Sequence, residues 1–334
     1  MVKHKCGLAI LAAVTSLAAS ACSGGRDALT IYSGREESLV EPLLERFAEE
    51  SGIPIDVRYG DSADLALLIE EEGDDTPADV FFSQSPGSVG FLDELGMLAS
   101  LEHSVLDTVP AGFRAEDGRW VGVTARQRVL VYNTEMVDKA ALPDSVFDLS
   151  GERWAGRVGL APTNASFQDF VTAMRQVAGE DWTRRWLEDM AASDNPTFPD
   201  NLSIVDAVSR GEVPMGLVNH YYNYQYLAEA PDSPTRNYVF PDGDIGALLI
   251  ATTASVLEPS QDRERAAQLV EFLLSEEAQR YFSEETFEYP LVSGVAPSKK
   301  LPALDTLEAP DFDIDRLGGG LRHTVGLISE SGLL

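Results

Sequence analysis

A stretch of aromatic and polar residues at 219–226, Asn-His-Tyr-Tyr-Asn-Tyr-Gln-Tyr, carries the side chains with the clearest chemical potential. It holds four of the ten tyrosines and one of the four histidines. The preceding residues, 213–218, form a short apolar run with a bias to β-branched side chains, which predicts a buried strand. Phenolic oxygens beside an imidazole at the end of a strand suggest a site for a hard metal cation. The alternative is a tyrosine-rich edge, partly buried, that keeps its hydroxyl groups in water.

The composition is that of a soluble globular protein with an acidic surface. The 334 residues allow one large domain or two of ordinary size, and 44% of them are hydrophobic. With 55 acidic and 25 basic residues, the formal charge is −30. Such a chain has no basic footprint with which to neutralise phosphates, and an anionic membrane surface would repel it. We therefore expect no nucleic-acid partner.

The N-terminus has the order of an export signal. A basic start at residues 3–5, an apolar run at 6–19 and small residues at 19–21 precede Cys22. The apolar run is too short for a stable membrane span. This order predicts a signal peptide over residues 1–21.

Cys22 is the expected point of attachment to the cell membrane. Small residues that end at a cysteine resemble a bacterial lipobox, although Ala19 stands where leucine is usual. We expect lipidation at Cys22, a lipid-anchored tether over residues 22–27, and a position outside the cytoplasm, in the periplasm or on the outer face. The membrane would then be contacted through the lipid alone. The alternative is ordinary cleavage after Ala21, which leaves a free thiol; in either case the mature chain has one cysteine and no internal disulfide.

The first hundred residues of the mature chain alternate between strand and helix patterns. Strands are predicted at 28–32, 53–59 and 78–82, with helices between them. This order implies parallel strands with helices on both faces of the sheet. Ligands of such sheets bind outside the carboxyl ends of the strands, which here include Ser-Gly-Arg-Glu at 33–36 and Ser-Gln-Ser at 83–85.

A strand-like crossover joins this series to a second one. Residues 120–133 predict a long strand or strand pair, with Arg126 and Arg128 on one face. A second β/α series begins near residue 156, and residues 244–256 return as an apolar strand. The predicted fold is α/β with two lobes, each a mainly parallel sheet flanked by helices, and a ligand cleft between the lobes.

Motifs of catalysis and of tight metal chelation are missing from the sequence. The alternating aspartates at 311–315 resemble the start of a calcium loop, but Arg316 and Arg322 stand where that loop needs glycine and glutamate. The glycines at 318–320 follow no strand, and there is no Walker A, HExxH or GxSxG motif. We therefore expect a binding protein and not an enzyme.

Several short motifs resemble those of the periplasmic ferric-ion-binding proteins of bacterial ABC importers, the bacterial transferrins. Each motif is short, but their order and spacing are specific together, and they cover essentially the whole mature chain. The motifs are Ile-Tyr-Ser-Gly at 31–34, Thr-Pro-Ala-Asp-Val-Phe at 76–81, Arg-Gln-Arg-Val-Leu-Val-Tyr-Asn at 126–133, Trp-Ala-Gly-Arg-Val-Gly at 154–159, Ala-Pro-Thr-Asn at 161–164, Asn-His-Tyr-Tyr at 219–222 and Glu-Tyr-Pro-Leu at 288–291.

The resemblance implies a two-lobed periplasmic-binding-protein fold that closes on its ligand by a hinge. It also implies that Tyr221 and Tyr222 bind Fe(III), and that the protein, as a monomer, delivers iron to an ABC permease driven by a separate ATPase. Fe(III) is a hard cation that prefers anionic oxygen, so it must displace the phenol proton, whose pKa is ordinarily about 10. The expected lobe boundaries are 28–128 with 250–302 for the first lobe, and 129–249 with 303–334 for the second.

The sequence departs from the family at two ligand positions. Some members have a histidine after the first strand and many have a glutamate after the third strand, whereas this chain has Glu36 and Gln84. Glu36 is a candidate further ligand, or alternatively an acid favoured by the helix dipole. Gln84, a poor ligand for Fe(III), is expected to line the cleft with His220, a neighbour that would orient the loop and not a metal donor.

Members that lack both ligands complete the iron shell with further tyrosine or with a synergistic anion such as carbonate or phosphate. Tyr224 and Tyr226 are extra candidates, although their family equivalents are not ligands. The expected anion-binding residues are Arg35, Arg126, Asn164, Ser166 and Asn201. The alternative for the arginines is ordinary ion pairing, and the alternative for the whole site is a small organic anion or phosphonate bound without metal.

Overall fold

The computed structural model describes residues 28–334; the expected signal peptide, the tether and Cys22 lie outside the described residues. The described strands are β1 (Leu29–Ser33), β2 (Ile55–Tyr59), β3 (Val80–Ser83), β4 (Val121–Asn133), β5 (Val158–Gly159), β6 (Met215–Asn219), β7 (Thr235–Tyr238), β8 (Leu249–Val256) and β9 (Tyr289–Pro290). The described helices are α1 (Glu37–Ser51), α2 (Ser62–Glu72), α3 (Pro86–Glu94), α4 (His103–Leu106), α5 (Ala165–Ala178), α6 (Glu180–Ala192), α7 (Asn201–Ser209), α8 (His220–Glu229), α9 (Arg263–Leu273), α10 (Glu276–Glu284) and α11 (Leu321–Ser331). The predicted α/β class is confirmed.

The first β/α series forms as predicted. Strand β1 lies between β2 and β3 and pairs with both in parallel. Helix α1 buries the apolar side chains that recur at helical spacing, and it ends at Gly52, whose left-handed φ of 70° suits glycine. The carboxyl ends of β1 and β3 therefore open at the same edge of the sheet, where Arg35 and Gln84 follow them.

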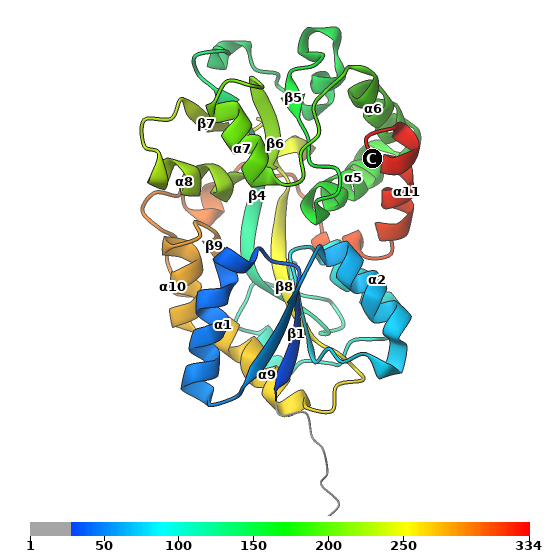
Figure 1. Ribbon diagram of the computed structural model, residues 1–334, viewed down its shortest axis with the longest axis vertical. Helices are drawn as coiled ribbons and strands as arrows, with labels where there is room; N and C mark the ends of the chain where they lie inside the picture. The colour runs from blue at the N-terminus through cyan, green and yellow to red at the C-terminus, as the bar shows by residue number, and fades with distance from the viewer. Residues whose placement is uncertain (1–27) are drawn as a thin grey trace, which may run out of the picture.

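Strand β4 connects the two halves of the molecule (Figure 1). Its first part, through Gln127, pairs antiparallel with β8, and its second part, from Arg128, pairs antiparallel with β6 and β7. We call the part built on β1, β2, β3, β8 and β9 the first lobe, and the part built on β5, β6 and β7 the second lobe. All thirteen residues of β4 are buried, so one strand carries the core of one lobe into the other.

The strand that returns from the second lobe to the first is shorter than the one predicted over residues 244–256. Strand β8 begins at Leu249, and Ile245–Ala247 form a 3₁₀ turn. The Asp244 carboxylate accepts hydrogen bonds from the backbone N–H groups of Gly246 and Val146. These side-chain-to-backbone bonds favour a turn over a strand, which an apolar pattern alone does not reveal.

The end of the chain packs on the second lobe. Helix α11 contacts α5 and α6, and the three helices lie together on one side of the molecule in Figure 1. Helices α7 and α8 cover β6, β4 and β7. Within residues 28–334, no helix has the length and apolar character needed to cross a membrane.

A close backbone contact joins α3 to the segment before α11. An added Cβ at Gly90 would lie 2.6 Å from Cα of Gly318. Backbone atoms cannot rotate away, so Gly90→Ala should lower the free energy of unfolding by about 1–3 kcal/mol despite the better helix propensity of alanine. Denaturant unfolding measures this effect. The matched control is Gly112→Ala, whose Cβ meets nothing within 4 Å; equal stability of the two variants would contradict the prediction.

Candidate functional site

The two consecutive tyrosines lie in the first turn of α8, directly after the buried strand β6. Strand β6 ends at Asn219 and the helix starts at His220, so Tyr221 and Tyr222 follow the strand end as the sequence predicts. Both side chains are buried, and their ring centroids are 4.2 Å apart. The chain therefore presents two neighbouring phenols from a rigid helix start.

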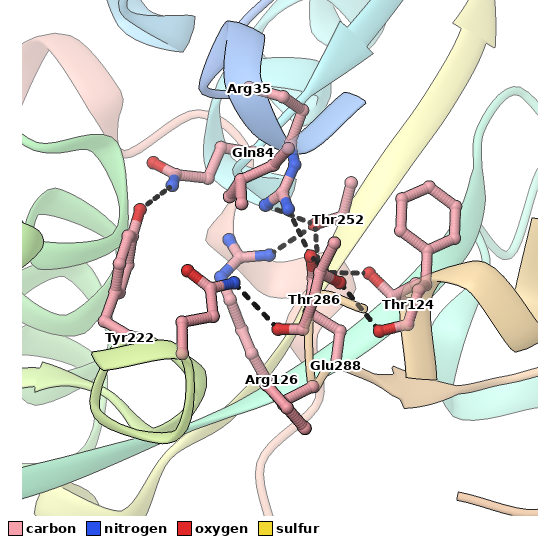
Figure 2. Close-up of polar contacts among 12 residues, drawn as sticks. Arg35, Gln84, Thr124, Arg126, Tyr222, Thr252, Thr286 and Glu288 are labelled. Atoms are coloured by element: carbon pink, nitrogen blue, oxygen red, sulfur yellow. Dashed lines mark hydrogen bonds and ion pairs between the residues drawn. The ribbon is translucent and has the colours of Figure 1, made fainter. Parts of the chain in front are cut away.

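The two phenol oxygens have different surroundings. Tyr221 Oη is buried and makes no hydrogen bond of good geometry, although the Arg35 guanidinium and the Tyr222 hydroxyl lie close to it. A buried polar group in this state is costly unless something binds it. Tyr222 Oη accepts a hydrogen bond of 3.4 Å from Nε2 of Gln84 (Figure 2). Burial, with Tyr221 and Glu36 nearby, raises the pKa of Tyr222 well above its ordinary value. A bound cation would be needed to hold this phenol in its anionic form.

His220 uses both of its ring nitrogens within the protein. Nδ1 accepts a hydrogen bond of 3.1 Å from the backbone N–H of Gln127, and Nε2 lies 2.9 Å from the Phe287 carbonyl oxygen, to which it donates. The ring stacks on Tyr289 at 4.8 Å. Burial lowers the pKa of His220 to about 3, so the ring is neutral. This geometry suits the orienting role expected for His220.

Gln84 bridges the two lobes. It follows β3 in the first lobe, yet it reaches Tyr222 and also accepts a hydrogen bond of 3.4 Å from Nδ2 of Asn164 in the second lobe. The side chain is 3% exposed. The residue at the usual glutamate position therefore contacts the phenol itself.

The predicted anion loop at the start of α5 is largely satisfied by its own residues. Asn164 caps the helix and accepts from both the backbone N–H and the hydroxyl of Ser166. The Ser166 hydroxyl also accepts from Arg128 and from Nδ2 of Asn219. The remaining oxygen, Asn219 Oδ1, is buried without a partner.

Asn201 and Glu36 differ in their exposure. Asn201 begins α7, is fully buried, and has neither side-chain atom paired. Glu36 precedes α1 with an exposed side chain that makes no capping bond. Partial burial, with the carboxylates of Asp200 and Asp61 nearby, raises the pKa of Glu36. The position of Glu36 directly before α1 is compatible with both expectations, a further metal ligand and an acid favoured by the helix dipole.

The two arginines expected at the anion have different partners. Arg35 forms a buried ion pair with Glu288. Burial alone would lower the pKa of Arg35, but the Glu288 carboxylate and the two tyrosines outweigh this effect and raise it. Arg126 donates one hydrogen bond, of 2.7 Å, to Thr252, while its Nε and Nη2 are buried without partners. Burial lowers the pKa of Arg126.

The donor set fits a hard trivalent cation accompanied by an anion. Two phenols can supply anionic oxygens to the cation, and the unpaired groups of Arg126 and Asn201 can donate hydrogen bonds to an anion. Arg35 lies with its Cζ 5.9 Å from the centre of the Tyr221 ring, so its charge is close to the phenols. Positive charge at this distance favours the phenolate form.

Three site residues were given no role by sequence reasoning: Glu288, Asn219 and Asp169. Glu288 and Asn219 stood in quoted motifs without an assigned role. For the two acids, the available signal was a single carboxylate inside an apolar run, Phe-Glu-Tyr-Pro-Leu at 287–291 and Phe-Gln-Asp-Phe-Val at 167–171. Charged residues are rarely fully buried without a partner, so such positions mark specific pairs.

Comparison with known proteins places the chain in a family. Residues 75–317 match the model of the bacterial extracellular solute-binding protein family. The chain is 30% identical to the Fe(3+)-binding periplasmic protein of Serratia marcescens over 98% of its own length and 97% of the relative's. The chain belongs to this family of bacterial solute-binding proteins. It is accordingly a binding protein and not an enzyme, and the resemblance to ferric-ion-binding proteins is confirmed.

Two further relatives support the assignment. The major ferric iron-binding protein of Neisseria meningitidis serogroup A is 29% identical, covering 97% of this chain and 98% of the relative. The iron-bound crystal structure of HitA from Pseudomonas aeruginosa superposes with a TM-score of 0.87 at 33% identity, covering 91% of this chain and 99% of that one. The two-lobed periplasmic-binding-protein fold is thereby confirmed.

A carboxylate of this solute-binding protein links the lobes near the site. Asp169 on α5 of the second lobe accepts a hydrogen bond of 2.6 Å from the Ser85 hydroxyl and one of 3.2 Å from the Gly87 backbone N–H, both in the first lobe. Its second oxygen, Oδ2, is buried without a partner. Burial raises the pKa of Asp169 to about 6 against the opposing effect of these donors.

The elevated pKa of Asp169 predicts a pH dependence of stability. The folded chain holds this proton more tightly than the unfolded chain, so the contribution is full below the ordinary pKa of 3.8 and is lost as pH rises through about 6. Asp169→Asn should remove this decline, which amounts to about 3 kcal/mol. Urea unfolding between pH 4 and 7 measures it. The control is Asp189→Asn at an exposed position of α6; parallel curves for Asp169→Asn and the wild type would refute the assignment.

Proposed function

We propose that this protein captures Fe(III) between its two lobes and delivers it to an ABC permease. Tyr221 and Tyr222 would bind the metal as phenolates, together with a synergistic anion. The observation that carries this proposal is the buried, unpaired Oη of Tyr221 beside the phenol of Tyr222, at the start of α8. Relatives that match over nearly their whole length are named as ferric-iron-binding proteins.

Iron capture in this proposal is coupled to loss of protons. The pKa of Tyr222 is raised mainly by burial, so its phenol stays protonated at neutral pH until the cation displaces the proton. The nearby guanidinium of Arg35 favours the phenolate once the metal has arrived. Acidification would return the protons and weaken binding, which offers a route for release.

The anion would occupy the space between the metal and the buried basic groups. Arg126 offers the free N–H groups at Nε and Nη2, and Asn201 offers an unpaired amide. Arg35, Asn164 and Ser166, also expected at the anion, already have partners within the protein. Carbonate and phosphate both match such donors, and Glu36 remains a candidate further ligand of the metal at the exposed side.

Closure would follow the division of β4. We propose lobes of residues 28–128 with 250–302 and 129–249 with 303–334. This boundary lies one residue beyond the point, between Gln127 and Arg128, at which the pairing of β4 passes from β8 to β6. The protein would act as a monomer with a permease and its separate ATPase. Lipidation at Cys22 would keep it at the cell membrane outside the cytoplasm.

A second candidate function is the capture of a small organic anion or phosphonate without metal. The unpaired N–H groups of buried Arg126 favour it, since they attract an anion by themselves. Gln84 also favours it, because this position carries an amide where many iron-binding members of the family have a glutamate ligand. Loading with Fe(III) separates it from the iron function.

Loading the purified protein with Fe(III) and carbonate should give a visible phenolate-to-iron charge-transfer band. Tyr221→Phe and Tyr222→Phe should each abolish or strongly shift this band and weaken iron binding by about 100-fold, since each removes a direct ligand. Tyr224→Phe, at a half-buried position that packs on Phe287, is the control and should keep the colour. A colourless wild type, or unchanged binding in both ligand variants, would refute the iron function.

The Gln84 position offers a gain of function. Gln84→Glu places a carboxylate beside Tyr222 Oη, and we expect Fe(III) affinity to rise about tenfold, because an anionic oxygen is a better ligand than an amide. Competition against a soluble chelator measures this change. Gln84→Ala removes the bridge to Asn164 without adding a ligand, and equal affinities of the two variants would contradict the prediction.

A further inference from the structure

Glu288 is the most densely bonded buried carboxylate at the site. Its side chain is fully buried and forms an ion pair with Arg35. Three hydroxyl groups also donate to it: Thr124 at 2.5 Å, Thr286 at 3.2 Å and Thr252 at 3.4 Å. Figure 2 shows these partners converging on one carboxylate from separate parts of the chain. Such a carboxylate is held in one place by its partners.

The backbone around Glu288 is fixed on both sides. Phe287 has a φ of 57°, an uncommon value for a bulky residue, and its carbonyl accepts from His220. Strand β9 then pairs Tyr289 with Ala125 and Pro290 with Thr124 of β4. Strained conformations persist where surrounding contacts enforce them, and they concentrate at functional sites.

Glu288 forms an ion pair with only one of the two neighbouring arginines. Both Arg35 and Arg126 donate to the hydroxyl of Thr252, at 3.1 Å and 2.7 Å, so their guanidinium groups lie close together. The carboxylate of Glu288 pairs with Arg35, whereas Arg126 has no ion pair among the described residues and keeps two unpaired nitrogens. One positive charge is therefore compensated and the other is available to a ligand.

The buried charges around the phenols do not sum to zero. Three guanidiniums and two carboxylates are buried there, which leaves one uncompensated positive charge; they are Arg35, Arg126, Arg128, Glu288 and Asp169. Fe(III) held by two phenolates adds one more positive charge. Isolated charge in a desolvated interior is unfavourable, so a ligand carrying two negative charges would make the enclosed site neutral.

We propose that Glu288 is a positioning residue that lowers the anion charge needed to neutralise the site from three to two, so that the site accepts a small oxyanion with two negative charges. This inference rests on the iron function proposed above. By neutralising Arg35, Glu288 removes one of the positive charges that the anion would otherwise have to balance. Glu288 would thus select the anion by its charge, whereas the hydrogen-bond donors of Arg126 and Asn201 would select it by its shape.

Variants that change the buried charge in opposite directions test this inference. Glu288→Gln adds one positive charge, Arg35→Gln removes one, and the double variant Arg35→Gln/Glu288→Gln restores the original total. The probes are sulfate and perchlorate, which share a tetrahedral shape and differ by one charge. The measured quantity is the ratio of their half-saturating concentrations on the iron-loaded protein, followed by the charge-transfer band.

Each variant has a distinct expected result. The preference for sulfate over perchlorate should rise about tenfold in Glu288→Gln and fall about tenfold in Arg35→Gln, the scale of one charge in a partly screened interior. The double variant should return to the wild-type ratio. The control is Glu277→Gln, which removes a half-exposed carboxylate paired with Arg46 and should leave the ratio unchanged.

The failures are distinguishable. A colourless wild type refutes the iron function itself. If colour forms but both single variants shift the ratio in the same direction, Glu288 supports structure alone and the inference is wrong. If the double variant keeps the low ratio of Arg35→Gln, Arg35 contacts the anion directly, which also overturns the inference. The double variant removes both charges of the Arg35–Glu288 pair and so leaves neither member of it unpaired. Its ratio, with unfolding curves that confirm it is folded, keeps the test independent of folding defects in the single variants.

Discussion

The continuity of β4 is the constraint on which the rest of the structure depends. One strand pairs with β8 in the first lobe and with β6 in the second, so residues near Gln127 belong to both lobes. Arg126 and Arg128 lie on either side of this handover and are both buried. The strand that joins the two lobes therefore carries two positive charges into the interior. Buried charge is unfavourable without hydrogen-bond or ion partners, so polar groups or a ligand must surround it.

The two buried arginines differ in how fully the surrounding residues hydrogen-bond to them. Arg128 donates to Ser166 and to the Leu217 carbonyl and lies over two phenylalanine rings, so both of its terminal nitrogens are satisfied within the second lobe and its Nε alone is unpaired. Burial still lowers the pKa of Arg128 to about 9. Arg126 lacks such partners, and its unpaired nitrogens lie near the phenols. The structure thus separates an arginine that supports the fold from one that is available to a ligand.

The sequence predicts the scaffold and the position of the two consecutive tyrosines better than it predicts the hydrogen-bond network. Apolar periodicity and strand-end residues suffice for β1 to β4 and for the position of Tyr221 and Tyr222, because these depend on local pattern. The pairing of Arg35 with Glu288 joins residues 253 positions apart, and no local pattern encodes it. The late start of β8, at Leu249, is not predicted because the Asp244 side chain, and not hydrophobicity, decides the turn before it.

The two phenols lie between regions of opposite charge. Outward from Tyr222, the exposed Glu36 is close to Asp61 and Asp200, and burial together with these like charges raises the pKa of Glu36 and of Asp61. Inward from Tyr221 lie the guanidiniums of Arg35 and Arg126. The outer carboxylates attract a cation and the inner guanidiniums attract an anion, so the phenols lie where the two charges would meet. Because Tyr221 and Tyr222 are consecutive, the start of a single helix places both phenols at this boundary.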